Sequence, residues 1–211
     1  MKHRQSAAVI LLIAVTTATV FGVQETKKSV QETKKGAANP PMDQKAAMEL
    51  MEKLATPGEG HKKLDFMVGS WVAKNSTWMA PGQAPMVSEG TSEHKWVLGG
   101  RFLEQRYEGT FMNSPFSGIG YTGFDNYRKQ YTSTWMDTSA TSILVMSGTF
   151  DASGKILTTT GKTDDFTSGK TAAIREKMTM VSKDEILFEL FGPGPDGKEF
   201  RMMEIRYTRK K

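Results

Sequence analysis

Few residues of this chain could carry chemistry, and His94 is the main candidate. The sequence contains three histidines and no cysteine, and only His61 and His94 lie beyond the N-terminal segment. Glu89 and Glu93 are close to His94, but in an alternating strand they point away from it. A zinc site draws three or four ligands from convergent positions, so the sequence predicts no metal site. A haem iron would need His94 as its axial ligand.

Hydrolytic chemistry has little support in the sequence. There is no Gly-x-Ser-x-Gly motif and no cysteine nucleophile, so a Ser–His pair would have to use His94 or His61. Acid–base chemistry by paired carboxylates stays open, because several acids lie on expected strands. Their orientation cannot be fixed from the sequence; they are Glu108, Asp137, Glu176 and Glu204.

Two segments, 118–123 and 192–197, fit the pattern Gly-x-Gly-x-x-Gly. A dinucleotide site needs this loop to begin a helix whose N-terminus meets the pyrophosphate. Both segments lead into a further strand, and the second contains two prolines. In the first, alternate glycines indicate a strand that bends or is closely approached. We therefore expect no nucleotide site and no cofactor.

The alternation of the strands gives a better clue to function. Within 86–97, Glu89, Thr91, Glu93 and Lys95 form a charged face that must point outward, so the opposite face points inward. Extending this alternation to the next strands predicts a pocket lining with aromatic bodies and isolated polar tips, typical of a small-molecule site. The predicted lining residues are His94, Trp96, Gln105, Tyr107, Tyr121 and Trp135. The alternative is a filled barrel whose buried polar groups are satisfied internally.

The elements that would position these residues are short strands, with turn signals about every ten residues from position 67 onward. They are expected near 67–79, 86–97, 101–111, 116–124, 129–137, 142–150, 155–161, 172–182, 185–191 and 199–208. The short connections favour an up-and-down order, and closure removes the two exposed edges. We predict an all-β fold: one antiparallel barrel of about ten strands over 60–211.

The N-terminus is expected to lie outside this fold. Residues 1–22 combine a basic start with an apolar run and small residues before Val23, which predicts a cleaved signal peptide and an exported protein, periplasmic or extracellular. The alternative, an uncleaved anchor, needs roughly 17–25 apolar residues. Residues 23–41 contain a duplicated Val-Gln-Glu-Thr-Lys-Lys and predict a flexible polar spacer. Residues 42–56 predict a short amphipathic helix capped by Asp43, either a lid or a leader.

Composition limits the partners. The formal charge of +5 falls to +3 when Lys2 and Arg4 leave with the signal peptide. The surplus is spread over many strands, whereas nucleic-acid surfaces cluster their basic residues, so we expect no nucleic-acid partner. No later segment is apolar enough to span a bilayer as a helix. Without cysteine no disulfide supports the domain, and we expect a monomer held by its core.

Several stretches resemble an uncharacterised bacterial family, domain of unknown function 1579 (DUF1579). They are Gly60–Leu64, Gly69–Trp71, Gly90–Glu93, Trp96–Leu103, Gly118–Asn126, Ser133–Asp137, Gly194–Phe200, Met203–Ile205 and Tyr207–Arg209. The resemblance covers essentially all of 60–211 and implies a calycin-like, lipocalin-like barrel without an agreed activity. By analogy with lipocalin-like barrels, Gly69 and Trp71 would mark the closed end, with Arg206 or Arg209 packed across the indole.

These observations favour an exported barrel that binds a small, largely apolar molecule in its interior. Two other readings stay open. One is an enzyme that uses the same cavity with His94, Tyr107 or Tyr121 as acid–base groups, whose sign would be a strongly shifted His94 pKa. The other is a filled barrel that acts through its surface in the cell envelope. An interior void above roughly 300 Å³ would favour the first two readings.

Overall fold

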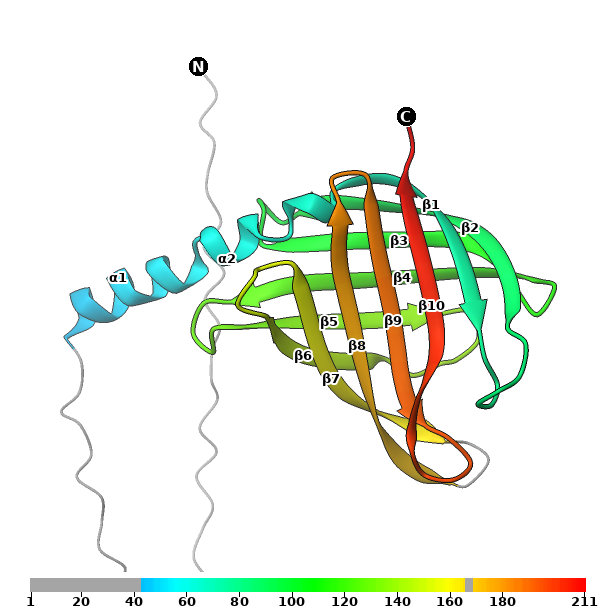
Figure 1. Cartoon of the computed structure of the whole chain (residues 1–211). Coiled ribbons are helices and arrows are strands. Elements are labelled where there is room, and N and C mark those ends of the chain that lie inside the picture. The colour runs from blue at the N-terminus through cyan, green and yellow to red at the C-terminus, as the bar shows by residue number, and fades with distance from the viewer. Residues whose placement is uncertain (1–42, 166–168) are drawn as a thin grey trace, which may run out of the picture. The chain divides into compact units, whose positions relative to one another are not determined.

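The computed structural model describes residues 43–165 and 169–211, which form a closed barrel of ten antiparallel strands (Figure 1). The predicted all-β barrel is therefore confirmed, and the observed bounds lie close to those expected. β7 differs most, because it runs on to Asp165 instead of ending at 161. The strands are β1 (Gly69–Thr77), β2 (Met86–Val97), β3 (Phe102–Phe111), β4 (Ser114–Asp125), β5 (Gln130–Asp137), β6 (Leu144–Phe150), β7 (Ile156–Asp165), β8 (Lys170–Ser182), β9 (Glu185–Pro193) and β10 (Glu199–Arg209).

The strand order follows the chain all the way round the barrel. Each strand pairs with the one before it and the one after it, and β1 closes the ring by pairing with β10, with Trp71 opposite Arg209. This up-and-down order is the one expected from the short connections. Closure leaves no unpaired sheet edge, so every strand has a hydrogen-bonded neighbour on both sides. In Figure 1, β8, β9 and β10 cross in front of β3, β4 and β5.

Short helical elements precede the first strand. They are α1 (Gln44–Ala55), α2 (Glu59–Lys62) and the single 3₁₀ turn η1 (Asp65–Met67). The helix expected over 42–56 is thus present as α1, but the Asp43 side chain makes no capping hydrogen bond. No residue of α1 is buried. α1 is tied to the β4–β5 turn, because Asn126 donates hydrogen bonds to the carbonyl oxygens of Leu54 and Thr56 at 2.9 and 2.8 Å.

One end of the barrel is closed by α2 and η1 together with the first residues of β1. Leu64, Met67 and Trp71 are almost completely buried there. The Tyr131 hydroxyl donates to the carbonyl oxygen of Gly60 at 2.8 Å, which fastens α2 to β5. These contacts fill the barrel at this end with large apolar side chains, and such burial contributes about 1.5–3 kcal/mol per side chain.

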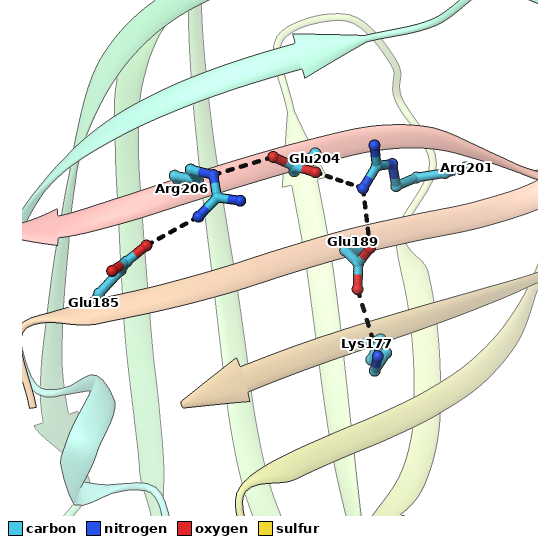
Figure 2. Close-up of polar contacts among 6 residues, drawn as sticks. All are labelled: Lys177, Glu185, Glu189, Arg201, Glu204 and Arg206. Atoms are coloured by element: carbon cyan, nitrogen blue, oxygen red, sulfur yellow. Dashed lines mark hydrogen bonds and ion pairs between the residues drawn. The ribbon is translucent and has the colours of Figure 1, made fainter. Parts of the chain in front are cut away.

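The outer wall carries charged side chains that pair across neighbouring strands. Figure 2 shows one such network on β8, β9 and β10. Arg201 contacts both Glu189, at 3.2 Å, and Glu204, while Arg206 contacts Glu204 at 3.3 Å and Glu185 at 3.0 Å. Because alternate residues face opposite sides of a strand, this charged outer face leaves Met203, Ile205 and Tyr207 of β10 facing inward.

Two predicted segments, the signal peptide over 1–22 and the polar spacer over 23–41, lie outside the described residues. Within the described part of the chain, no helix has the length and apolar character needed to cross a membrane.

Candidate functional site

The barrel encloses a cavity of about 300 Å³. Its wall is mostly apolar and aromatic, with contributions from strands all around the barrel. Interior cavities of roughly 300–1,000 Å³ with apolar walls and a few polar groups are typical of small-molecule sites. The aromatic and methionine residues of the wall include Tyr107, Phe116, Trp135, Met178, Phe188 and Met203.

The cavity lies away from the end that α2 and η1 close. Its wall extends from Gln105 and Tyr207 to Asp137 and Ser139, where β5 leads into the loop before β6. Ser139 is exposed, so the cavity reaches the surface beside this loop. Trp71 is completely buried at the closed end and does not border the cavity. The barrel thus has one packed end and one end through which a ligand could enter.

Two glycines of β4 make room for the indole of Trp135. A Cβ atom placed on Gly118 would lie 2.2 Å from Trp135 Cζ2, and one on Gly120 would lie 3.1 Å from Cε3. The ring therefore lies flat against the β4 backbone instead of filling the cavity. Its Nε1 donates a 2.7 Å hydrogen bond to Asp137 Oδ2, which fixes the ring orientation. The alternate glycines of 118–123 are thus positions of close approach, as expected.

Glu176 of β8 brings a carboxyl group into the cavity wall. Thr159 Oγ1 of β7 donates a hydrogen bond to Glu176 Oε2 at 2.9 Å. Within the described chain, no lysine, arginine or histidine pairs with Glu176. Burial raises the pKa of this carboxyl, because an ionised carboxylate loses its hydration inside the barrel, and the Thr159 bond offsets this only in part.

A chain of hydrogen bonds crosses the interior from β10 to β2. Gln105 Nε2 donates to the Tyr207 hydroxyl at 3.3 Å and to Ser92 Oγ at 3.1 Å, and Ser92 Oγ lies 2.9 Å from His94 Nε2. Gln105 and Tyr207 border the cavity, whereas Ser92 and His94 lie behind them, nearer the closed end. The chain satisfies polar groups that the barrel would otherwise bury unpaired.

His94 is only 3% exposed, and its Nδ1 finds no hydrogen-bond partner in the described residues. Burial, together with the positive charge of Arg209, lowers its pKa to about 4. The imidazole is therefore neutral at physiological pH. The large shift that would mark an acid–base residue is present, but its main cause is enclosure, and His94 does not border the cavity.

Only three of the six residues predicted to line a pocket border the cavity. Gln105, Tyr107 and Trp135 border the cavity, whereas His94, Trp96 and Tyr121 do not. Trp96 lies at the closed end, where its Nε1 donates to Asp65 Oδ1 at 2.8 Å. His94 faces inward, as the charged face of its strand requires.

The inward orientation expected for Tyr121 is wrong. Tyr121 lies opposite Glu104 on the outer face, and its hydroxyl donates to Glu104 Oε2 at 2.9 Å. Glu104 is only 6% exposed although it is outside, because Arg106, Lys95 and Tyr121 cover it. The physical reason is the Trp135 ring, which requires the small residues of β4 to face inward and so turns Tyr121 out.

The residues assigned to the closed end are close together, with one exception. The guanidinium carbon of Arg209 lies 4.1 Å from the centroid of the Trp71 ring. Gly69 has a φ of +123°, and a Cβ there would lie 2.6 Å from Arg209 Nη1, so both the backbone and the neighbour require glycine. Arg206, the other candidate, faces outward and pairs with Glu185 and Glu204 (Figure 2).

Glu176 is a cavity residue whose orientation the sequence left undecided. Of the four strand acids, Glu176 and Asp137 border the cavity, whereas Glu108 is exposed and Glu204 takes part in the outer network. A signal was present, because Ile174, Met178 and Met180 share the alternating face of Glu176. It was obscured because charged Arg175 and Lys177 flank Glu176, so charge alone did not distinguish the two faces.

Among residues 43–165 and 169–211, no group of three or more His, Asp or Glu side chains is placed to hold a metal ion.

A closed antiparallel barrel with one packed end and an interior cavity is the architecture of calycin-like proteins. The chain belongs to the family described as protein of unknown function DUF1579, which it matches over residues 56–209. No protein of the curated set matches the chain.

A solved structure shares the fold at low sequence identity. Rv2717c from M. tuberculosis is 15% identical, with a TM-score of 0.55 over 74% of this chain and 100% of that chain. A redesigned β-barrel, mFAP0, bound to DFHBI, is 14% identical, with a TM-score of 0.38 over 68% of this chain and 99% of that chain. At such identity the likeness to Rv2717c is one of fold alone.

Proposed function

We propose that this protein binds a small, largely apolar molecule in the barrel interior. The observation that carries the proposal is the cavity of about 300 Å³ with a mostly apolar wall that reaches the surface near Ser139. A barrel that served only as a filled scaffold would have no use for such a space, because an interior void forfeits packing contacts. The wall also contains Met178 and Met203, whose flexible side chains adapt to the shape of an apolar ligand.

Binding is better supported than catalysis in the same cavity. Of the three residues considered as acid–base groups, His94 lies behind the wall and Tyr121 is on the outer face. Tyr107 does border the cavity, but burial raises the pKa of its hydroxyl, so it stays protonated at neutral pH. None of the three residues is therefore placed and charged as an acid–base group for a ligand in the cavity.

The direct test is titration with the neutral fluorescent probe N-phenyl-1-naphthylamine. We expect saturable binding with enhanced probe emission and quenching of tryptophan emission, because Trp135 lies in the wall. The variant Leu190→Trp places a large side chain in the cavity and should weaken binding at least about tenfold. Leu187→Trp is the matched control, because Leu187 lies on the outer face of the same strand, opposite Arg206.

Both variants must unfold cooperatively for the comparison to hold. Saturable binding to the parent that Leu190→Trp leaves unchanged would place the probe elsewhere and contradict interior binding. Absence of binding to the parent protein would favour the filled, surface-acting barrel instead.

We also propose that the protein is exported, with residues 1–22 removed ahead of Val23. Support comes from the basic start and apolar run of this segment. N-terminal sequencing of the protein recovered from the cell envelope and medium should read Val23 or a residue close to it. Recovery of chains that retain Met1 in the membrane fraction would contradict cleavage and favour an anchor.

A further inference from the structure

The charges of the cavity wall have one sign. The wall contains the carboxyl groups of Asp137 and Glu176, and no lysine, arginine or histidine is found among the described residues that border it. The chain as a whole nevertheless carries a formal charge of +5. Inside a low-dielectric enclosure the sign of the nearest charges decides which ions enter. The cavity wall therefore repels anions and attracts cations.

The half-buried carboxyl of Glu176 has no charged partner among the described residues. Its Oε2 accepts the 2.9 Å bond from Thr159, but within the described chain no cation and no further hydrogen-bond donor contacts the carboxyl. Ionising such a group without a counter-ion is costly, which is why its pKa is raised. A positive charge brought by a ligand would offset this cost. Asp137 differs, because Trp135 and Ser139 already donate hydrogen bonds to its two oxygens.

The aromatic part of the wall favours the same kind of ligand. Phe116, Trp135 and Phe188 border the cavity together with two tyrosines. An ammonium group over an aromatic face is attracted by the ring electrons, and the attraction is strongest when the ammonium is desolvated. The Tyr107 hydroxyl does not add to this, because its oxygen is buried against Gly90 and Gly109.

We propose that the ligand is an apolar molecule with a single protonated amine, which pairs with the Glu176 carboxylate. The inference rests on the proposed function, because it specifies the occupant of the same cavity. The apolar body of the ligand fills the space between the aromatic and methionine side chains. Neutral apolar molecules of similar size bind more weakly, and carboxylates are excluded.

The test compares three ligands that share one apolar body but differ in charge. 2-Naphthylmethylamine, 2-naphthalenemethanol and 2-naphthoate each compete with N-phenyl-1-naphthylamine at pH 7.5. We expect the amine to bind at least about tenfold more tightly than the alcohol, and the carboxylate to bind least, as the Coulomb interaction with the wall requires. This comparison needs only the unmodified protein, so it does not depend on any variant folding.

Glu176→Gln then assigns the effect to the carboxyl. The variant should bring the amine to the affinity of the alcohol, while the alcohol stays within about twofold of its parent value. Glu108→Gln is the matched control, because it removes the same charge from an exposed position on β3 and should leave all three affinities unchanged.

The pH dependence is a second signature of the pair. Since Glu176 must lose its proton to pair with the amine, the affinity for the amine should rise as the pH increases through the raised pKa of Glu176 in the parent and stay level in Glu176→Gln.

Equal affinity for the amine and the alcohol, or strongest binding of the carboxylate, would overturn this inference. If N-phenyl-1-naphthylamine still binds, the proposed function survives. If neither that probe nor any naphthyl compound binds, both proposals fail.

Discussion

The guanidinium group of Arg209 lies over the ring of Trp71, with 4.1 Å between the guanidinium carbon and the ring centroid. Its Nη1 and Nη2 also donate hydrogen bonds to the carbonyl oxygens of Val68 and Phe66, at 2.6 and 3.0 Å. The last strand is thereby fixed to the segment that enters the first strand, at the packed end of the barrel. One side chain therefore joins the last strand of the barrel to the start of the first through packing, charge and hydrogen bonds.

Arg209→Lys should destabilise the barrel because lysine lacks the planar group that stacks on Trp71 while donating to two carbonyls. We expect a loss of about 1–3 kcal/mol in the free energy of unfolding, measured in urea. Arg206→Lys is the matched control on the same strand, and it should cost no more than about 0.5–1 kcal/mol because its ion pairs are on the outer surface. Probe affinity should not change in either variant. Equal losses would contradict a special role for the closed end.

His94 should make the protein sensitive to mild acid. Its pKa is lowered from 6.5 to about 4 in the folded protein, so between these values the unfolded chain binds a proton that the folded chain does not. Stability is therefore complete above about pH 6.5 and falls as the pH drops toward 4, by an amount on the order of 3 kcal/mol.

Urea unfolding of the parent and of His94→Gln, measured from pH 7 to pH 4, checks this expectation. The variant lacks the titrating ring, so the difference in stability between the two proteins should change with pH over this interval. Parallel curves would show that His94 is not enclosed as described.

Glu176 should have the opposite pH dependence. Its pKa is raised in the folded protein, so the folded chain holds a proton that the unfolded chain loses above pH 4.5. The stability linked to this group is present below that pH and falls as the pH rises through the folded pKa. Glu176→Gln should therefore melt at a higher temperature than the parent at pH 8, while the two should converge near pH 4. A variant that melts lower at pH 8 would indicate an existing cation partner.

Gly118 should not tolerate a side chain while Trp135 is present. The added Cβ would lie 2.2 Å from Trp135 Cζ2, so Gly118→Ala should cost about 1–3 kcal/mol by overpacking. The same change at Gly58, where a Cβ meets no atom within 4 Å, should cost much less. In the double variant Gly118→Ala with Trp135→Leu the penalty should largely disappear. Additive losses in this cycle would show that the ring does not lie against the β4 backbone.

The sequence alone determined the architecture. Short alternating strands with brief turns impose sequential pairing, and ten such strands avoid exposed edges only by closing. The alternation also placed His94 inside, because Glu93 and Lys95 must contact water. This inference worked because β2 has one clearly charged face and one that is not.

The alternation of strand faces gave a wrong orientation, or none, where a strand lacks one charged and one uncharged face. Arg175 and Lys177 flank Glu176, so charge could not show that the middle residue of the three faces inward. On β4 neither face carries a charge before Asp125 at its end. The residue that decides is Trp135 on the neighbouring strand, whose ring needs glycine beside it. Which of Arg209 and Arg206 packs across the Trp71 indole depended on where β10 meets the closed end. The cavity itself follows from the closed barrel, because its volume is the space that inward side chains of ten strands leave together, which no single strand encodes.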